Sequence, residues 1–503
     1  MRRRAFLGSA AAALAGAVLP RRGFTANTPV PRGVPAVSRT GKELLLPKAD
    51  VEDLRRSLWG TVLLRDDDGY DAARRIWNGA IDRKPALIAR CFNTADVMRA
   101  VQFAAAHDVL VAVRAGGHSS AGKSMCDGGL VIDLSAMREV RVDPVRRVAR
   151  VQGGALLGDL DRAAQAHGLA CTAGTVSHTG VGGLTLGGGL GHLGRQYGLT
   201  IDHLLGAEVV TAKGERVTAS DDENADLFWG VRGGGGNFGV ATSFEFKLHP
   251  FGTTIHRGRL AYPLPLARRV LQFLAEYATQ LPDESTLESA LVSLPDNRRI
   301  LTVTLLHAGS IDAAERHMDA FKAVATPAMH SLETVPYLDL QSEDDAQFAA
   351  GQHAYLKAGF IRALSDDTID AMLAGIEAAT LPVAQVIAFP QLGGAISRVD
   401  ARATAFAHRD AAYAGIIALI WQDPSLTEAL LAWARATWKR IEPSARGAYV
   451  NFLSADDPHA RVRESYGINF ERMVELKNKY DPSNLFRLNA NVEPTKQGGQ
   501  PTS

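Results

Sequence analysis

Short apolar runs alternate with an amphipathic stretch near the start of the chain. Residues 86–92 and 110–117 are apolar runs of the length expected for buried strands. Between them, residues 94–109 carry apolar side chains near helical spacing, and Thr94 is expected to cap that helix. The pattern therefore predicts a strand–helix–strand unit.

The same kind of pattern continues to about residue 250. It predicts further strands, a helix over residues 156–167 and a hairpin that turns at Lys213 and Gly214. The expected strands are residues 129–135, 147–154 and 241–250, and the expected hairpin spans residues 206–219.

The pattern of apolar and polar residues changes after residue 250. Residues 266–281 form an amphipathic pattern that predicts a helix, and apolar runs at 290–295, 300–309 and 413–422 predict strands of an α+β unit. The last 50 residues read as polar and loop-rich. Residues 28–47 are rich in proline, glycine and basic residues, so we expect a linker there.

Composition narrows the class of protein. The chain has 503 residues, of which 46% are apolar and 22% charged, which is typical of a cored globular protein with more than one domain. The net charge is +1, and outside residues 1–26 there are 50 basic and 54 acidic residues. No basic field therefore points to nucleic acid as a partner.

The cysteine count excludes other classes of site. Cys91, Cys126 and Cys171 lack the spacing of a zinc cluster or a disulfide framework, so no metal is expected. One disulfide is possible, and at least one thiol is left over.

The first 27 residues read as an export signal. Arg3 and Arg4, followed by Ala5-Phe6-Leu7 and an alanine-rich apolar run, resemble a twin-arginine signal, with an ordinary secretory signal as the alternative. The apolar run is too short for a permanent anchor. The mature protein is therefore expected to be periplasmic or secreted and free of the membrane.

Glycine is concentrated in residues 180–191 and 226–239, and a third loop, residues 114–119, carries two more glycines. Glycine lets backbone N–H groups approach an anion closely. A dinucleotide fingerprint must open a helix, and the run from Gly187 to Gly189 argues against one there, so NAD binding is disfavoured. Three such loops favour a long diphosphate ligand.

His118 is the candidate for chemistry in the third loop. It follows a predicted strand and Gly116-Gly117, and Ser119 and Ser120 come after it. A lone loop histidine is usually structural. An imidazole beside backbone N–H donors, however, suits covalent attachment of an electrophilic cofactor.

Taken together and in order, these motifs resemble the FAD-linked oxidases of the vanillyl-alcohol-oxidase superfamily, most closely the berberine-bridge-enzyme-like branch. The resemblance covers roughly residues 45–495. The motifs that carry it are residues 114–122, 180–191, 197–199 with Asp202, 226–239, 449–452, 466–470, 479–486 and 489–491.

The resemblance implies an α+β fold in which a discontinuous FAD-binding domain, residues 48–250 and 446–497, holds an inserted substrate domain of antiparallel sheet and helices, residues 251–445. It implies a covalent bond between His118 and the flavin 8α-methyl group. The other implied FAD contacts are Arg114, Ala115, Gly116, Gly117, Ser119, Thr179, Gly180, Gly182, Gly183, Gly187, Gly239, Val240, Tyr449, Asn451 and Asn489.

The chain departs from the family pattern at two positions. Many relatives attach FAD a second time through a cysteine, but Val176 stands there, and Cys171 is expected to be a core thiol. A histidine that often follows the GVGG run is Leu184. We therefore expect a single covalent link. Thr179 stands at the position that controls oxygen access and favours an oxidase.

The resemblance implies hydride transfer from a small alcohol, sugar or amine to flavin, with O₂ reoxidation to H₂O₂. The alternative is a dehydrogenase, or a ligand-binding flavoprotein with little oxidase turnover. Tyr449 is the candidate base if its pKa is lowered. Polar groups of plant relatives fall at Ser120, Leu190 and about Ile417, and two of these are apolar. Further pocket candidates, of lower rank, are His178 and Gln422.

Overall fold

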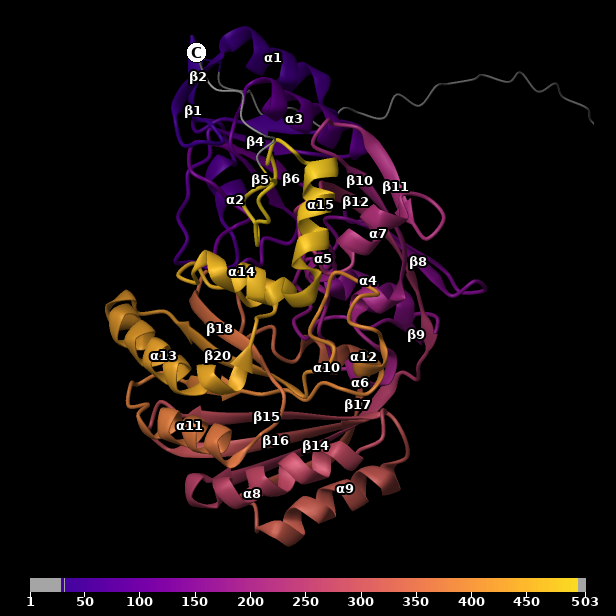
Figure 1. Ribbon diagram of the computed structural model, residues 1–503, viewed down its shortest axis with the longest axis vertical. Helices are drawn as coiled ribbons and strands as arrows, with labels where there is room; N and C mark the ends of the chain where they lie inside the picture. The colour runs from indigo at the N-terminus through magenta and orange to yellow at the C-terminus, as the bar shows by residue number, and fades with distance from the viewer. Residues whose placement is uncertain (1–28, 31, 496–503) are drawn as a thin grey trace, which may run out of the picture.

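The computed structural model describes residues 29, 30 and 32–495, so the predicted export signal lies outside the described residues. Figure 1 shows two parts: one built from the first half of the chain and its C-terminal segment, the other from the middle of the chain. The first part contains sheets of four and five strands, and the second is built on a sheet of eight. The expected mixture of helix and antiparallel sheet is confirmed.

The predicted linker is a strand hairpin rather than a loop. β1 (Gly33–Val37) and β2 (Glu43–Pro47) pair antiparallel over their whole length. Val34 and Leu46 are buried and pack into the same apolar core as α1 (Lys48–Ser57). Pro35, Glu43 and Pro47 lie within these strands, whose alternate side chains reach the core.

The four-stranded sheet contains the strand–helix–strand unit that the sequence predicts. β4 and β5 both pair parallel with β6, and α3 crosses between them. The cap of α3 is Asn93, whose side chain accepts a hydrogen bond from the Asp96 backbone at 3.0 Å, and not Thr94. The elements of this unit are β3 (Thr61–Leu63), α2 (Tyr70–Arg74), β4 (Leu87–Arg90), α3 (Thr94–Ala106), β5 (Val111–Arg114) and β6 (Leu130–Asp133).

The five-stranded sheet is antiparallel and includes the predicted hairpin. Its strands are β7 (Val140–Asp143), β8 (Val148–Gln152), β10 (Leu204–Val210), β11 (Arg216–Ser220) and β12 (Val240–Lys247). The helices beside it are α4 (Leu157–Gln165), α5 (Val181–Gly187), α6 (Gly194–Tyr197) and α7 (Ala225–Val231), and β9 (Leu169–Ala170) pairs with β13 (His249–Pro250).

Both long glycine clusters contain a helix, which the sequence did not suggest. α5 occupies the start of residues 180–191, and α7 occupies the start of residues 226–239. Burial of Val181 and Thr185 on one side of α5 compensates for the low helix propensity of its glycines.

The eight-stranded sheet is antiparallel throughout, and helices cover one of its faces (Figure 1). Its strands are β14 (Thr254–Pro263), β15 (Ser285–Ser293), β16 (Arg299–His307), β17 (Met329–Pro336), β18 (His353–Ile361), β19 (Gln385–Ala388), β20 (Tyr413–Trp421) and β21 (Ala445–Arg446). Its helices are α8 (Leu264–Tyr277), α9 (Ile311–Val324), α11 (Asp366–Glu377) and α13 (Thr427–Ile441), with the shorter α10 (Tyr337–Ser342) and α12 (Ala395–Arg398) in connections.

Strand β20 shows which side chains face the first part of the molecule. Ile417 is fully buried in the core beneath the helices, whereas Ile416 packs against a cluster that contains Tyr449. Because side chains alternate along a strand, Ile416 and not Ile417 is on the face toward Tyr449 at the position expected at about Ile417. Ile416, Ala418 and Ile420 are the half-buried residues of β20, all on the face away from Ile417.

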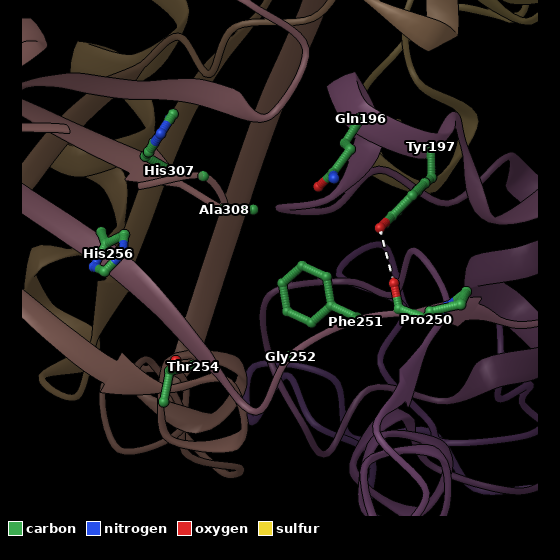
Figure 2. Close-up of a pocket in the computed structure, with 10 residues that line it drawn as sticks. Gln196, Tyr197, Pro250, Phe251, Gly252, Thr254, His256, His307 and Ala308 are labelled. Atoms are coloured by element: carbon green, nitrogen blue, oxygen red, sulfur yellow. Dashed lines mark hydrogen bonds between the residues drawn. The ribbon is translucent and has the colours of Figure 1, made fainter. Parts of the chain in front are cut away.

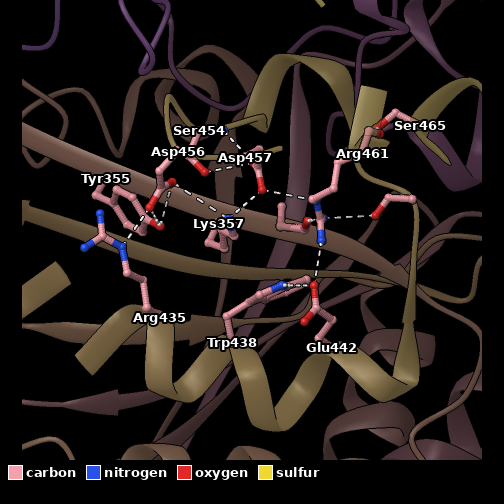
Figure 3. Close-up of polar contacts among 12 residues, drawn as sticks. Tyr355, Lys357, Arg435, Trp438, Glu442, Ser454, Asp456, Asp457, Arg461 and Ser465 are labelled. Carbon is pink, nitrogen blue, oxygen red and sulfur yellow. Dashed lines mark hydrogen bonds and ion pairs between the residues drawn. The ribbon is translucent and has the colours of Figure 1, made fainter. Parts of the chain in front are cut away.

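The C-terminal segment is more helical than its polar sequence suggests. α14 (His459–Tyr466) and α15 (Phe470–Tyr480) pack into the core of the five-stranded sheet. The loop before α14 reaches the eight-stranded sheet, where Lys357 of β18 donates to Asp457 at 2.5 Å and Arg461 pairs with Asp457 at 3.1 Å (Figure 3). This segment therefore joins the two parts.

The described residues include no helix long and apolar enough to cross a membrane. Cys91, Cys126 and Cys171 are free thiols, and all three are buried. Each belongs to an apolar cluster, so they serve as small core side chains.

Candidate functional site

The loop after β5 and the loop before α5 meet backbone to backbone. A Cβ atom added at Gly116 would lie 2.4 Å from the amide nitrogen of Gly180, and one added at Gly180 would lie 2.4 Å from that of Gly116. Glycine is therefore required on both sides of this contact. Gly182 similarly meets the carbonyl of Gly153 at 2.6 Å, whereas Gly183 faces open space.

The loop of residues 114–119 is fixed by hydrogen bonds to neighbouring segments. Arg114 donates to the carbonyl of Ala73 and lies 3.8 Å from Asp133, while its Nε atom has no partner. Gly117 has a φ of +70°, which favours glycine. Its carbonyl accepts from the amide of Trp77 at 3.0 Å, and Ser119 Oγ accepts from the amide of Lys123.

His118 lies between two aromatic rings. Its Nε2 atom is 2.9 Å from Nδ1 of His178, and its ring stacks on Trp77 with the ring centres 4.5 Å apart and the planes 16° apart. Burial, reinforced by the neighbouring His178, lowers the pKa of His118 to about 3. The imidazole is therefore neutral at physiological pH and keeps a lone pair available.

Tyr449 and Asn451 approach α5 from the C-terminal segment. The hydroxyl of Tyr449 accepts hydrogen bonds from the Gly189 amide at 3.0 Å and from Asn451 Nδ2 at 2.9 Å. Asn451 also donates to the carbonyls of Gly183 and Leu184. Only glycine fits at Gly187, because an added Cβ would lie 2.4 Å from the Asn451 amide.

The phenol of Tyr449 does not meet the condition set from the sequence. Burial raises its pKa, and the hydrogen bonds from Gly189 and Asn451 lower the pKa only in part. No cation contacts the hydroxyl among the described residues. At neutral pH the phenol is therefore protonated.

The second glycine cluster reaches the same helix. The amide of Gly235 donates to the Leu186 carbonyl of α5 at 2.8 Å. Asn489 donates to the carbonyl of Gly236 at 3.0 Å, and its Oδ1 atom is buried without a partner. Gly239 and Val240 are buried where β12 begins, and Val240 pairs with Val210 of β10.

The structure thus gathers the three glycine loops, His118, Tyr449 and Asn451 around α5. Trp77 was missed, because a lone tryptophan between helix and strand carries no motif and its contact depends on the tertiary fold. His178 was ranked low and is the direct partner of His118. Gln422 is exposed beyond the end of β20.

Thr179, the residue expected to control oxygen access, and Val176, which stands where relatives carry a second attachment cysteine, lie beside this cluster. Thr179 is half-buried, and its carbonyl accepts from the amide of Leu157 at 2.9 Å. Val176 is buried, and Leu184 is half-buried within α5. The Ser120 hydroxyl is buried without a partner.

A separate cavity of about 310 Å³ opens near the junction of β13 and β14 (Figure 2). Tyr197, Phe251 and His307 line it, and Tyr197 donates to the Pro250 carbonyl at 3.3 Å. None of the predicted cofactor residues lines this cavity. No group of three or more His, Cys, Asp or Glu side chains in the described residues is arranged to hold a metal ion.

Comparison with known proteins covers both parts of the chain. Residues 85–220 match the family model described as FAD binding domain, and residues 448–493 match the one described as berberine and berberine like. An FAD-linked oxidoreductase of Dictyostelium discoideum is 32% identical over 447 residues, 88% of this chain and 97% of the relative.

Two further relatives carry named activities. The (R)-6-hydroxynicotine oxidase of Paenarthrobacter nicotinovorans is 31% identical over 462 residues, 87% of this chain and 97% of the relative. A solved xylooligosaccharide oxidase from Myceliophthora thermophila has a TM-score of 0.79 and 26% identity, and the match covers 89% of this chain and 100% of that chain. The chain therefore belongs to the berberine-bridge-enzyme-like family of FAD-linked oxidoreductases.

Proposed function

We propose that this protein is an exported oxidase that removes hydride from a carbon next to nitrogen or oxygen in a small, largely apolar substrate. FAD, attached once through His118, takes the hydride and returns the electrons to O₂. The observation that carries the proposal is the meeting of His118, the three glycine loops and Tyr449 around α5.

The residues at this site fit the cofactor. Buried polar atoms without partners gather here, among them Arg114 Nε, Ser120 Oγ, His178 Nε2 and Asn489 Oδ1. A ligand with phosphate, hydroxyl and ring-nitrogen groups would supply their missing partners. The residues proposed to hold FAD are Arg114, Ala115, Gly116, Gly117, His118, Ser119, Thr179, Gly180, Gly182, Gly183, Gly187, Gly239, Val240, Tyr449, Asn451 and Asn489.

The side chains available support a single covalent link. His118 meets His178 through Nε2, which leaves Nδ1 as the nitrogen proposed to form the bond. Val176 stands where many relatives carry a second attachment cysteine, and Cys171 is buried in the core.

The face of β19 and β20 that points away from the covering helices supports the proposed substrate class. Ile416, Ala418, Val386 and Ala388 alternate with fully buried neighbours and are half-buried on that face. None of them carries a charge. This surface suits an apolar ring or chain, and a neutral amine suits it best because amine oxidation needs no strong base.

Tyr449 is the group placed to take a proton from an alcohol substrate. Its hydroxyl accepts two hydrogen bonds, which also stabilise the phenolate once it forms. Because burial keeps the phenol protonated at neutral pH, alcohols should react more slowly than the matching amines.

The chain is proposed to divide by role as well as by fold. Residues 48–250 and 446–497 form the FAD-binding unit, and residues 251–445 form the substrate unit. Residues 1–27 direct export by the twin-arginine route, which carries proteins already folded around their cofactor.

Release of H₂O₂ tests the function. The purified protein should be yellow and release H₂O₂ with at least one of a panel of amines, the alcohols matched to them, and xylobiose. Turnover only with an artificial electron acceptor would make the protein a dehydrogenase. Flavin binding without any turnover would leave a ligand-binding flavoprotein, and either result overturns the oxidase proposal.

A further inference from the structure

His118 and His178 form the only histidine pair that the described residues show at the proposed attachment point. His118 follows β5 and His178 precedes α5, so the contact between Gly116 and Gly180 brings the two imidazoles together. The ring of Trp77 limits rotation of His118 on its other side. The Nε2 atom of His118 is thereby directed at Nδ1 of His178, at 2.9 Å.

We propose that His178 is a positioning residue that orients His118 and accepts its proton during covalent attachment of the flavin. This inference rests on the proposed link through His118. His178 acts through His118, and nothing in its own position requires it to contact the substrate.

The hydrogen bond between the two rings can run in either direction, and only one direction permits attachment. When His118 Nε2–H donates to His178 Nδ1, the lone pair of His118 Nδ1 is free to attack. The reverse direction puts a proton on Nδ1 of His118 and blocks attack there. His178 selects the first arrangement when its own proton is on Nε2.

The environment of His178 supports this role. The backbone and hydroxyl of the preceding Ser177 donate to Asp345 at 2.8 and 2.5 Å, which anchors the loop. His178 Nε2 is buried and has no partner. The proposed ligand would supply the acceptor for a proton on Nε2, which leaves Nδ1 as the acceptor nitrogen that faces His118.

The attachment step balances with oxygen as the oxidant. The bond formed joins His118 Nδ1 to the flavin 8α carbon, while one C–H bond of that methyl group and the Nε2–H bond of His118 break. The Nε2 proton passes to His178 Nδ1 and then to solvent. Two electrons pass through the flavin to O₂, which takes two protons and becomes H₂O₂.

The test measures covalent flavin and does not depend on turnover of substrate. Full-length protein made without flavin is mixed with FAD in air, and acid-precipitated samples are assayed over time for flavin fluorescence on gels. His178→Ala should attach flavin roughly 100-fold more slowly than the wild type, the scale of a lost proton acceptor. Added imidazole should restore part of the rate.

Two comparisons separate proton transfer from positioning and from general damage. His178→Asn keeps a hydrogen-bond acceptor but no base, so it should remain at least tenfold slow. His249 on β13 makes a matching contact of 3.0 Å with His203, which precedes β10, and His249→Ala should attach flavin at the wild-type rate. Non-covalent FAD binding, read by fluorescence quenching, should persist in all three variants.

Each outcome decides the question. A wild-type rate in His178→Ala overturns the inference, and a wild-type rate in His178→Asn overturns the proton-acceptor role. Wild-type protein that binds FAD but never attaches it would instead overturn the link through His118. A loss of attachment in His249→Ala as large as in His178→Ala would also count against a specific role.

Discussion

At the scale of single residues, the hydroxyl of Tyr449 separates two substrate classes. Tyr449→Phe should lower kcat/KM for an alcohol by roughly 100-fold, because the base is lost, and for the matching amine by less than about tenfold. For the wild type with an alcohol, kcat/KM should rise with pH, about tenfold per unit below the raised phenol pKa. The variant should lose that slope.

The control for Tyr449 is a tyrosine with a similar buried hydroxyl outside the site. Tyr262 donates to the Phe321 carbonyl at 3.2 Å in the core beneath the eight-stranded sheet. Tyr262→Phe should change stability without changing the ratio of amine to alcohol rates. An equal fall in alcohol and amine rates for Tyr449→Phe would contradict a role as base.

Asp161 gives a pH dependence of stability that is independent of catalysis. It is buried and accepts a hydrogen bond from Gln341 at 3.1 Å, and burial raises its pKa to about 7. The folded state therefore binds a proton between about pH 4 and 7 that the unfolded state releases. Stability from this group should fall by about 1.4 kcal/mol per pH unit across that window and stay lost above it.

The variant Asp161→Asn removes that titration and keeps a hydrogen-bonding side chain. Its melting temperature should exceed that of the wild type at both pH values, and by more at pH 8 than at pH 5, where the wild type has lost only the first part of this stability. Differential scanning calorimetry at the two pH values measures the difference. An advantage of the same size at both pH values would contradict the assignment to Asp161.

Residues differ in how far the sequence alone could place them. His118 could be singled out from the sequence because Gly116 and Gly117 precede it, and a histidine beside backbone N–H donors suits cofactor attachment. Trp77 and His178 gain their meaning only from contacts across the fold, 41 and 60 positions away from His118. Ile416 and Ile417 could not be told apart without the register of β20.

At the scale of elements, substitutions of Gly180, which precedes α5, and of Gly183 within α5 should have opposite effects on stability. Gly180→Ala should prevent the close approach to Gly116, where the added carbon would lie 2.4 Å from a backbone nitrogen. We expect this variant to fold less stably and to lose FAD binding. Gly183→Ala meets nothing within 4 Å and should stabilise the flavin-free protein by up to about 1 kcal/mol through helix propensity.

Titration with FAD completes this pair of variants. If FAD lies against Gly183 as proposed, Gly183→Ala should weaken FAD binding although the flavin-free protein melts no lower. Unchanged FAD affinity in Gly183→Ala would remove α5 from the proposed cofactor surface. Gly252, exposed between β13 and β14, has no positive φ and no atom closer than 3.9 Å to an added Cβ, so it is a control position for the effect of an added methyl group on FAD binding.

The sequence pattern predicted helices and strands correctly where the apolar periodicity was strong. The parallel strands around α3 were predicted by their apolar runs, as were β16, β20 and part of β15, whereas the other five strands of the eight-stranded sheet were not predicted. α5 was not, because its glycines have low helix propensity and its stability comes from tertiary packing. β1 and β2 were read as a linker, since their few apolar residues only acquire a core when α1 covers them.

At the scale of the whole molecule, Lys477 holds the C-terminal segment in place. Its ammonium is fully buried and donates to Asp481 at 2.7 Å and to the carbonyls of Asn237 and Phe486. Lys477→Met removes the buried positive charge beside the Asp481 carboxylate, which still accepts from the Leu485 and Phe486 amides, and should cost about 3–5 kcal/mol in urea unfolding, with weaker FAD binding. Lys479 lies two residues from Lys477 and forms an exposed ion pair with Asp226. Lys479→Met should lower the free energy of unfolding by less than about 1 kcal/mol. Equal costs would contradict the anchoring role.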